Sequence, residues 1–280
     1  MTSVSTVSHS TGVQAGQTRT RDGTRLVYSL RGPANAQKRI ALVHSLAMDG
    51  TFWQPVAERL AETACVLTYD CRGHGGSDKP AGPYTVELFA DDLADLLDHL
   101  GWRSAVVAGA SMGGCVSLAF AARHPARTAG LGLIDTTAWY NAMPAWQDRA
   151  NKARTEGLAS LIGFQVTRWF SDAFRAEHPD VVQACVDVFL RNDLPAYAET
   201  CLMLGACDLR AALPGITVPT AVIVGEEDYA APVAMSQVMH DGIKGSSLTV
   251  LEKARHLTPL ERPDVIAAAL DRLMEAGCRA

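Results

Sequence analysis

The run Ser104-Ala-Val-Val-Ala108 leads directly into Gly109-Ala110-Ser111-Met112-Gly113. The first of these two segments is mostly apolar and partly β-branched, which is typical of a buried strand, and a helical pattern follows from Cys115. The pentapeptide fits G-x-S-x-G, in which a serine occupies a tight turn from strand to helix. Such a turn strains the serine backbone and requires small neighbours. A serine that only caps the helix is the alternative, but the strand-turn-helix context favours Ser111 as a nucleophile.

The same alternation of strand and helix continues along the chain. Short apolar runs rich in β-branched residues alternate with stretches whose apolar residues recur every three or four positions. This pattern predicts an α/β fold, with a mostly parallel sheet flanked by helices. The expected strands are Ile40–Val43, Cys65–Tyr69, Ser104–Ala108, Leu131–Ile134, Thr220–Val224 and Leu248–Leu251, with an antiparallel edge strand between Gly23 and Leu30. The expected helices are 53–60, 86–100, 115–123 and 265–274.

One long interruption divides this pattern. From residue 138 to residue 213 the sequence is helical in pattern without a strand, and Pro214 and Pro219 mark the return to the sheet. In an open α/β sheet ligands bind beyond the carboxyl ends of the strands, so an insertion placed here is expected to cover the site as a lid. We therefore expect a disordered leader over residues 1–20, a core made of residues 21–137 and 214–280, and a helical lid over residues 138–213.

Composition and charge narrow the class of function. The 280 residues carry 25 Lys and Arg against 30 Asp and Glu, a net charge of −5 without a basic block, so no nucleic-acid partner is expected. No apolar run approaches the ~20 residues that span a bilayer. The seven cysteines lack CxxC spacing, and the leader lacks the basic and apolar regions of a secretory signal. These features predict a cytoplasmic protein and leave the oligomeric state open, with a homo-oligomer allowed.

A serine hydroxyl is a weak nucleophile, so it needs a base and a third group that holds the tautomer of that base. The order expected along the chain is serine, acid, histidine. His256 follows the last expected strand, in a loop that would hang over the strand ends, and is the predicted base. Asp228 follows the penultimate strand and is the predicted acid, with Asp135 at the end of an earlier strand as its competitor.

Acyl transfer also places negative charge on a carbonyl oxygen, and backbone N–H groups must stabilise this charge by hydrogen bonds. The expected donors are the amide of Met112, at a helix N-terminus, and the amide of Leu46, in the loop after an earlier strand. His44 in the same loop is expected to pin that loop through hydrogen bonds. No cluster of His, Cys, Asp or Glu has metal-ligand spacing, so neither a metal nor a cofactor is expected.

Taken together, these motifs resemble the α/β-hydrolase superfamily over about residues 25–275. They are His44-Ser45-Leu46, Asp70-x-Arg72-Gly-His74-Gly-x-Ser77, Gly109-x-Ser111-x-Gly113-Gly114, Gly225-x-x-Asp228 and His256. Within the superfamily the chain is similar to 3-oxoadipate enol-lactonases, through Trp146-x-x-Arg149, Arg168-Trp-Phe170, Phe174-Arg175, Tyr197 and Cys207-Asp-Leu-Arg210 of the expected lid. His44-Ser45 and Thr258-Pro259 depart from the lactonase pattern and are similar to the wider superfamily.

The resemblance implies cofactor-free opening of a small enol-lactone to 3-oxoadipate, in the catabolism of aromatic compounds. Because that substrate is anionic, the pocket should hold a positive group, for which Arg149 and Arg168 are candidates beside Trp146. Two alternatives stay open. One keeps the catalytic serine but acts as a carboxylesterase, another lactonase or a hydrolase of carbon–carbon bonds, and the other is a non-catalytic ligand-binding module of the same fold.

Overall fold

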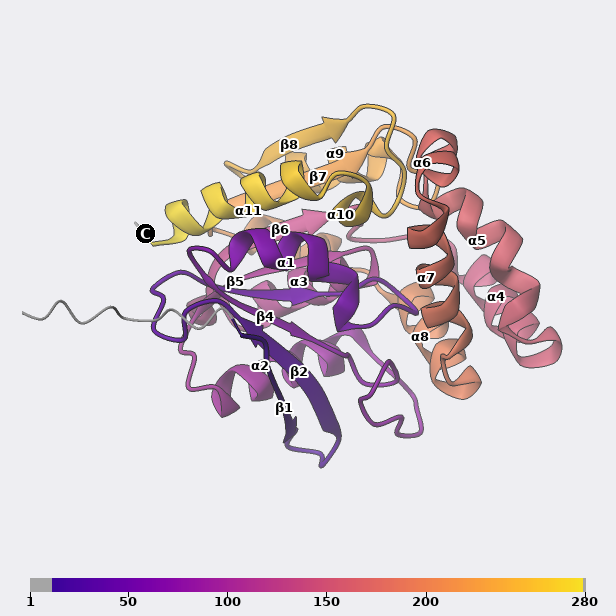
Figure 1. Cartoon of the computed structure of the whole chain (residues 1–280), viewed down its shortest axis with the longest axis horizontal. Coiled ribbons are helices and arrows are strands. Elements are labelled where there is room, and N and C mark those ends of the chain that lie inside the picture. Colours follow the sequence, from indigo (N-terminus) through magenta and orange to yellow (C-terminus); the bar gives the residue numbers. More distant parts are fainter. Residues whose placement is uncertain (1–11, 279–280) are drawn as a thin grey trace, which may run out of the picture.

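The computed structural model describes residues 12–278, and its centre is an eight-stranded sheet with helices on both faces (Figure 1). The strand order is β1-β2-β4-β3-β5-β6-β7-β8, with β3 to β8 parallel and β1 and β2 antiparallel. The predicted α/β class with a mostly parallel sheet is therefore confirmed. The strands are β1 (Gln14–Arg19), β2 (Arg25–Arg31), β3 (Arg39–Val43), β4 (Cys65–Tyr69), β5 (Ala105–Ala110), β6 (Thr128–Ile134), β7 (Thr220–Gly225) and β8 (Ser247–Leu251).

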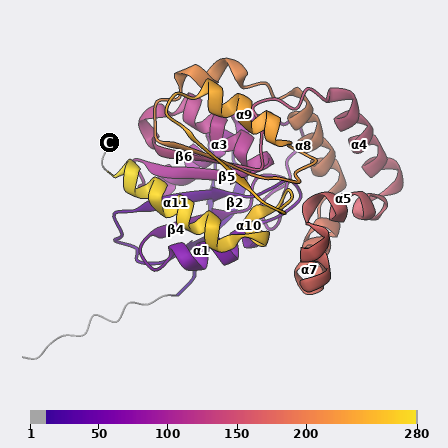
Figure 2. The same cartoon turned by 90° about the horizontal axis from the view of Figure 1, so that it is seen from above.

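Helices cover the sheet because its inner strands are apolar on both faces. Every residue of β4, β5 and β7 is buried, as expected for parallel strands between two helical layers. One layer holds α1 (Gln54–Leu60), α10 (Thr258–Glu261) and α11 (Pro263–Gly277), and the other holds α2 (Val86–His99), α3 (Met112–Arg123) and α9 (Val233–Gly242) (Figure 2).

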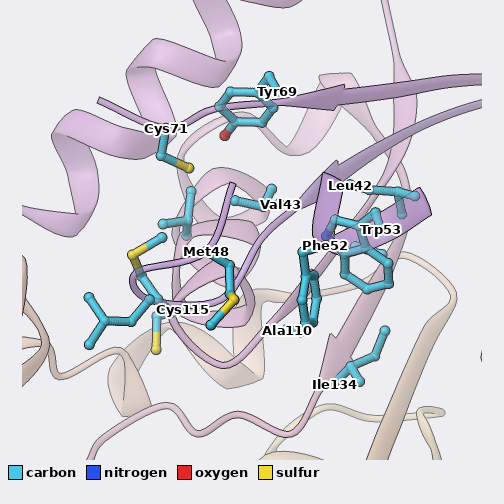
Figure 3. Close-up of a cluster of buried hydrophobic side chains, with 14 of the residues drawn as sticks. Leu42, Val43, Met48, Phe52, Trp53, Tyr69, Cys71, Ala110, Cys115 and Ile134 are labelled. Atoms are coloured by element: carbon cyan, nitrogen blue, oxygen red, sulfur yellow. The ribbon is translucent and has the colours of Figure 1, made fainter. Parts of the chain in front are cut away.

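The order of the strands leaves a crevice in the middle of the sheet. β3 lies between β4 and β5, and α1 leaves β3 across one face while α3 leaves β5 across the other (Figure 2). Loops that diverge in this way open a crevice at the carboxyl ends of the two strands. A buried apolar cluster lies at this edge of the sheet (Figure 3). It includes the last residues of four strands, Val43, Tyr69, Ala110 and Ile134, together with Met48, Phe52, Trp53 and Cys115.

The segment between β6 and β7 is helical, and its helices lie together beyond the carboxyl ends of the strands, at the right of Figure 1. A bridge between Trp139 and Asp208 joins the two ends of the segment. The division into a core and a lid at residues 138 and 213 stays a prediction. The helices of this segment are α4 (Met143–Glu156), α5 (Ile162–Trp169), α6 (Asp172–Glu177), α7 (Pro179–Leu190) and α8 (Leu194–Ala206), with short 3-10 helices at Leu158–Leu161 and Arg210–Gly215. Two further 3-10 helices, Gly50–Trp53 and Pro125–Arg127, lie earlier in the chain.

The expectation of a disordered leader over residues 1–20 is wrong for its last part. Gln14–Arg19 form β1, which pairs antiparallel with β2 across the turn at Asp22-Gly23, whereas residues 1–11 lie outside the described residues. The edge strand expected between Gly23 and Leu30 corresponds to β2. Because β1 pairs with its free edge, β2 is the second strand of the sheet and β1 is the edge strand. β1 is polar and largely exposed, so it lacks the apolar alternation by which a strand is recognised.

The turn after β5 depends on the small size of Gly109. A Cβ atom at this position would lie 2.0 Å from the carbonyl oxygen of Gly113 in the first turn of α3. We predict that Gly109→Ala lowers the free energy of unfolding by about 3 kcal/mol, because backbone must move to make room.

The matched control is Gly163→Ala in α5, where no atom lies within 4 Å of the added Cβ. This variant should raise the free energy of unfolding by up to about 1 kcal/mol, since alanine favours a helix over glycine. Urea denaturation of both variants measures the difference. Equal unfolding midpoints in the two variants would contradict the close approach at residue 109.

Candidate active site

Ser111 occupies the junction of β5 and α3 with a backbone conformation that L residues rarely adopt, with a φ of 55° and a ψ of −116°. Such a conformation costs about 1–3 kcal/mol and persists only where the surroundings enforce it. Here the Ser111 N–H donates to the carbonyl of Ile134 at 2.9 Å, and the Ser111 carbonyl accepts from Oγ1 of Thr136 at 2.6 Å. The turn therefore holds the Ser111 side chain at the carboxyl end of a central strand.

Two backbone amides adjoin this serine. Met112 is the first residue of α3, so its N–H has no acceptor within the helix. A Cβ atom at Gly113 would lie 2.1 Å from the carbonyl oxygen of Val43, which shows how closely α3 approaches the end of β3. The loop that follows β3 carries Leu46, whose N–H has no acceptor among residues 12–278. Leu46 lines the cavity above Ser111, whereas Met112 is fully buried and is not among the lining residues.

His256 connects Ser111 to Asp228. Its Nε2 lies 2.8 Å from Oγ of Ser111, and its Nδ1 lies 2.8 Å from Oδ2 of Asp228. An ionised carboxylate only accepts hydrogen bonds, so Nδ1 carries the proton and Nε2 accepts from the serine hydroxyl. All three side chains are buried. This chain of hydrogen bonds can remove the serine proton and stabilise the resulting imidazolium.

The loop after β7 fixes the Asp228 carboxylate. Its Oδ1 accepts hydrogen bonds from the amides of Ala230 at 2.7 Å and Ala231 at 2.8 Å, which leaves Oδ2 for the imidazole. These bonds set the direction of the carboxylate before any substrate arrives.

The competing carboxylate, Asp135, has other partners. Its Oδ1 accepts from the amide of Gly225 at 3.1 Å, and its Oδ2 accepts from the amide and hydroxyl of Thr258 at 2.9 and 2.7 Å. Burial, and then the nearby charge of Asp228, raise the pKa of Asp135 well above its ordinary value. Asp135 therefore ties the end of β7 to the histidine loop instead of contacting the imidazole.

Two buried histidines support the loop after β3. Nδ1 of His44 donates to the carbonyl of Ser45 at 2.8 Å, and Nε2 of His44 accepts from the amide of Cys71 at 3.0 Å. The ring of His74 stands edge-on to His44 with 5.0 Å between the centroids. Burial lowers the pKa of His44, and burial together with the neighbouring His44 lowers the pKa of His74 to about 3. Both rings are therefore neutral in the folded protein at pH 7.

A cavity of about 510 Å³ opens above Ser111 and His256. Leu46 contributes from the loop after β3, Trp146 and Arg149 contribute from α4, and Arg168 contributes from α5. The remaining wall is mostly apolar. Its other residues are Ser45, Tyr140, Ala142, Ala145, Asp148, Lys152, Ser160, Leu161, Phe164, Gln165, Trp169, Tyr229, Ala230, Pro232 and Met235.

The positive charge of Arg149 is not neutralised by a carboxylate. Its Nε donates to the hydroxyl of Tyr197 at 2.6 Å, and its guanidinium carbon lies 5.1 Å from the ring centroid of Trp146. No carboxylate oxygen lies within 4.0 Å of its nitrogens in the described part of the chain. Arg168 donates to the carbonyl of Tyr229 at 2.5 Å, and burial and then the charge of Arg149 lower the pKa of Arg168. The cavity therefore suits a small anionic ligand.

Sequence reasoning missed four aromatic residues of the cavity wall, Tyr140, Phe164, Trp169 and Tyr229. Tyr229 directly follows Asp228, and that position was the available signal. Tyr140 lies six residues beyond the end of β6, where only the path of the lid brings it back toward Ser111.

The described residues were also compared with the requirements of a metal site and of a membrane-spanning helix. Among residues 12–278, no group of three or more His, Cys, Asp or Glu side chains is placed to hold a metal ion. Over the same range, none of the helices combines the length and apolar character that crossing a membrane requires.

Comparison with known proteins points to one family. The model of the family described as "alpha/beta hydrolase fold" matches residues 38–263. The chain is 33% identical to 3-oxoadipate enol-lactonase 2 of Acinetobacter baylyi, over 92% of this chain and 96% of that protein. The crystal structure of the enol-lactonase from Burkholderia xenovorans superposes with a TM-score of 0.89 at 36% identity, covering 93% of this chain and 100% of that one. A thermophilic esterase from Thermogutta terrifontis superposes with a TM-score of 0.87 at 30% identity, covering 94% and 99%.

The neutral His74 predicts a pH dependence of stability. An unfolded histidine has a pKa near 6.5, so between about pH 3 and pH 6.5 the unfolded chain binds a proton at residue 74 that the folded chain does not. Stability contributed by the neutral ring is therefore lost as the pH falls below 6.5, by up to about 1.4 kcal/mol per pH unit.

We expect His74→Gln to flatten this dependence. Urea denaturation at pH 7, 6 and 5 gives the slope of the free energy of unfolding against pH, and His178→Gln, on an exposed residue of the lid, is the control. Parallel slopes for His74→Gln and the wild type would show that the ring takes up its proton in the folded state.

Proposed function

The chain belongs to the α/β hydrolase family, and we propose that within it the chain opens 3-oxoadipate enol-lactone to 3-oxoadipate through an acyl-enzyme. The chain is a hydrolase, and its relatives from Acinetobacter baylyi and Burkholderia xenovorans are named enol-lactonases. The observation that carries the proposal is the hydrogen-bonded chain from Ser111 through His256 to Asp228, beside a cavity that holds an unneutralised arginine.

In the proposed acylation step, Oγ of Ser111 attacks the carbonyl carbon of the lactone. Nε2 of His256 takes the serine proton as the new bond forms, and Asp228 stabilises the imidazolium. Negative charge develops on the carbonyl oxygen, to which the amides of Leu46 and Met112 donate. Each such donor is worth ~3 kcal/mol of the barrier.

Ring opening breaks the bond between the carbonyl carbon and the ring oxygen. The ring oxygen leaves with the electron pair as an enolate, and the proton held on His256 converts the enolate into a ketone. A water molecule then gives a proton to His256 and attacks the acyl carbon. Oγ of Ser111 leaves and recovers its proton from Nε2, the new carboxylic acid loses its proton to solvent, and a dicarboxylate is released.

The cavity wall supplies the recognition that this substrate needs. The enol-lactone carries a carboxylate in addition to the lactone ring, and Arg149 is placed for a charge-assisted hydrogen bond to it. Burial, and then the positive charge of Arg149, lower the pKa of Arg168, and a bound carboxylate would relieve the repulsion between the two arginines. Trp146 provides an apolar surface beside the ring.

The proposed substrate places the protein in the catabolism of aromatic compounds. A cytoplasmic setting belongs to the same proposal and is supported by the cysteines, all seven of which are free, with six of them buried. A small molecule is the only partner that this function needs.

A carboxylesterase is the second candidate, because the chain also resembles the esterase from Thermogutta terrifontis at 30% identity. The two candidates share the serine chemistry and differ in the acyl group. Rates on the enol-lactone, on neutral lactones and on simple aryl esters separate them.

The first test is the release of 3-oxoadipate from its enol-lactone by the purified protein. We expect turnover by the wild type and a loss of kcat of about 10³-fold or more in Ser111→Ala, with an unchanged melting temperature. Undiminished turnover in Ser111→Ala would contradict the acyl-enzyme. Turnover of aryl esters alone would replace the lactonase proposal with the carboxylesterase.

The second test concerns recognition of the carboxylate. Arg149→Met should raise KM for the anionic lactone about 10- to 100-fold, because a charge-assisted hydrogen bond is lost, and should change KM for a neutral lactone much less. Arg154→Met is the matched control on the same helix, since Arg154 pairs with Glu199 outside the cavity wall. Equal losses on both lactones would remove Arg149 from carboxylate recognition.

A further inference from the structure

Tyr140 brings a buried phenol to the cavity without a partner for its hydroxyl. Its side chain is 7% exposed, and the hydroxyl oxygen is buried and makes no hydrogen bond within residues 12–278. Tyr140 and Ser111 line the same cavity. Buried polar groups are nearly always hydrogen-bonded, so an exception in a native protein calls for an explanation, and a catalytic role is one.

The Tyr140 ring packs against the cavity wall. Its ring stands edge-to-face on Trp146, with 5.2 Å between centroids and 75° between planes. It belongs to the connection that follows β6, and β6 and β3 lie on opposite sides of β5. Tyr140 and Leu46 therefore reach the cavity from connections that leave the sheet on different sides of β5.

The chemistry of the hydroxyl makes it a donor. Burial raises the pKa of Tyr140 well above its ordinary value. The phenol thus keeps its proton at neutral pH. Oγ of Ser111 donates its own proton to His256 and keeps lone pairs that can accept.

We propose that Tyr140 is a further catalytic residue, whose hydroxyl donates a hydrogen bond to Oγ of Ser111 as that oxygen leaves the acyl carbon during deacylation. In this step the bond between the acyl carbon and Oγ breaks, the electron pair stays on Oγ, and the proton comes from Nε2 of His256. The phenol proton stays on Tyr140. The inference rests on the proposed role of Ser111 as nucleophile.

The two half-reactions should respond differently to this hydrogen bond. During acylation Oγ uses a lone pair to form the new bond. A hydrogen-bond donor to Oγ therefore stabilises the free enzyme and does not accelerate acylation. During deacylation negative charge grows on Oγ, and a hydrogen bond to it strengthens in the transition state. Loss of the donor should therefore slow deacylation selectively.

The test is Tyr140→Phe, which keeps the ring against Trp146 and removes only the hydroxyl. Stopped-flow release of 4-nitrophenol from 4-nitrophenyl acetate separates the burst from the steady state, and intact-mass spectrometry of quenched protein measures the acetyl adduct. We expect deacylation to fall about tenfold with acylation unchanged, so that the acetyl adduct accumulates.

The matched control is Tyr84→Phe, because Tyr84 is also buried and its hydroxyl donates to the carbonyl of Pro80 away from the cavity wall. This control should leave the ratio of the two rates unchanged. Site-specific 3-fluorotyrosine at residue 140 is a second variant that keeps the hydroxyl and makes it a stronger donor, and its deacylation should be at least as fast as that of the wild type.

The outcomes are separable from those of the proposed function. If the wild type forms no acetyl adduct on Ser111, the nucleophile and this inference fail together. An adduct that lives equally long in the wild type and in Tyr140→Phe, or an equal slowing of both steps, overturns the role of Tyr140 alone. Slower deacylation in the fluorotyrosine variant also overturns it.

Discussion

The hydrogen bond between Ser111 and His256 joins two residues that are 145 positions apart in the chain. Parallel strands make it possible, because the loops after β5 and β8 leave the sheet at the same edge. The two strands are nevertheless separated by β6 and β7, a span of about 14 Å at the usual strand spacing. The loop that carries His256 must therefore reach back across two strands, and the structure has to hold it there.

Several contacts hold that loop on both sides of the histidine. Asp135 at the end of β6 accepts from the amides of Gly225 and Thr258. The amide of Leu257 donates to the carbonyl of Trp169 in the lid at 3.0 Å. Buried Glu261 joins the same two parts, since it accepts hydrogen bonds from Ser171 and from the amide of Arg255. The helical segment between β6 and β7 thus helps to position the imidazole and also forms part of the cavity wall.

Local signals predict the core of this protein well. Ser111 follows from a strand, a tight turn and a helix in succession, and the buried parallel strands follow from their continuous apolar runs. β1 is not predictable in this way, because an exposed polar edge strand is held by main-chain hydrogen bonds that leave no apolar pattern.

Choices between distant residues are harder to predict, because tertiary packing decides them. Asp135 and Asp228 both follow strands next to the site, and only their hydrogen-bond partners distinguish the two. Tyr140 reaches the cavity through the path of the lid, which helical periodicity does not describe. Prediction from sequence is therefore strongest where one element determines the position of a residue, and weakest where several elements meet.

The most direct test of Ser111 as the nucleophile is to identify, by peptide mass spectrometry, the residue to which an alkyl fluorophosphonate attaches. We expect an adduct on Ser111 in the wild type and a greatly reduced labelling rate in His256→Ala, because the imidazole accepts the serine proton. Labelling of another residue in place of Ser111, or an equal labelling rate without the imidazole, would contradict it.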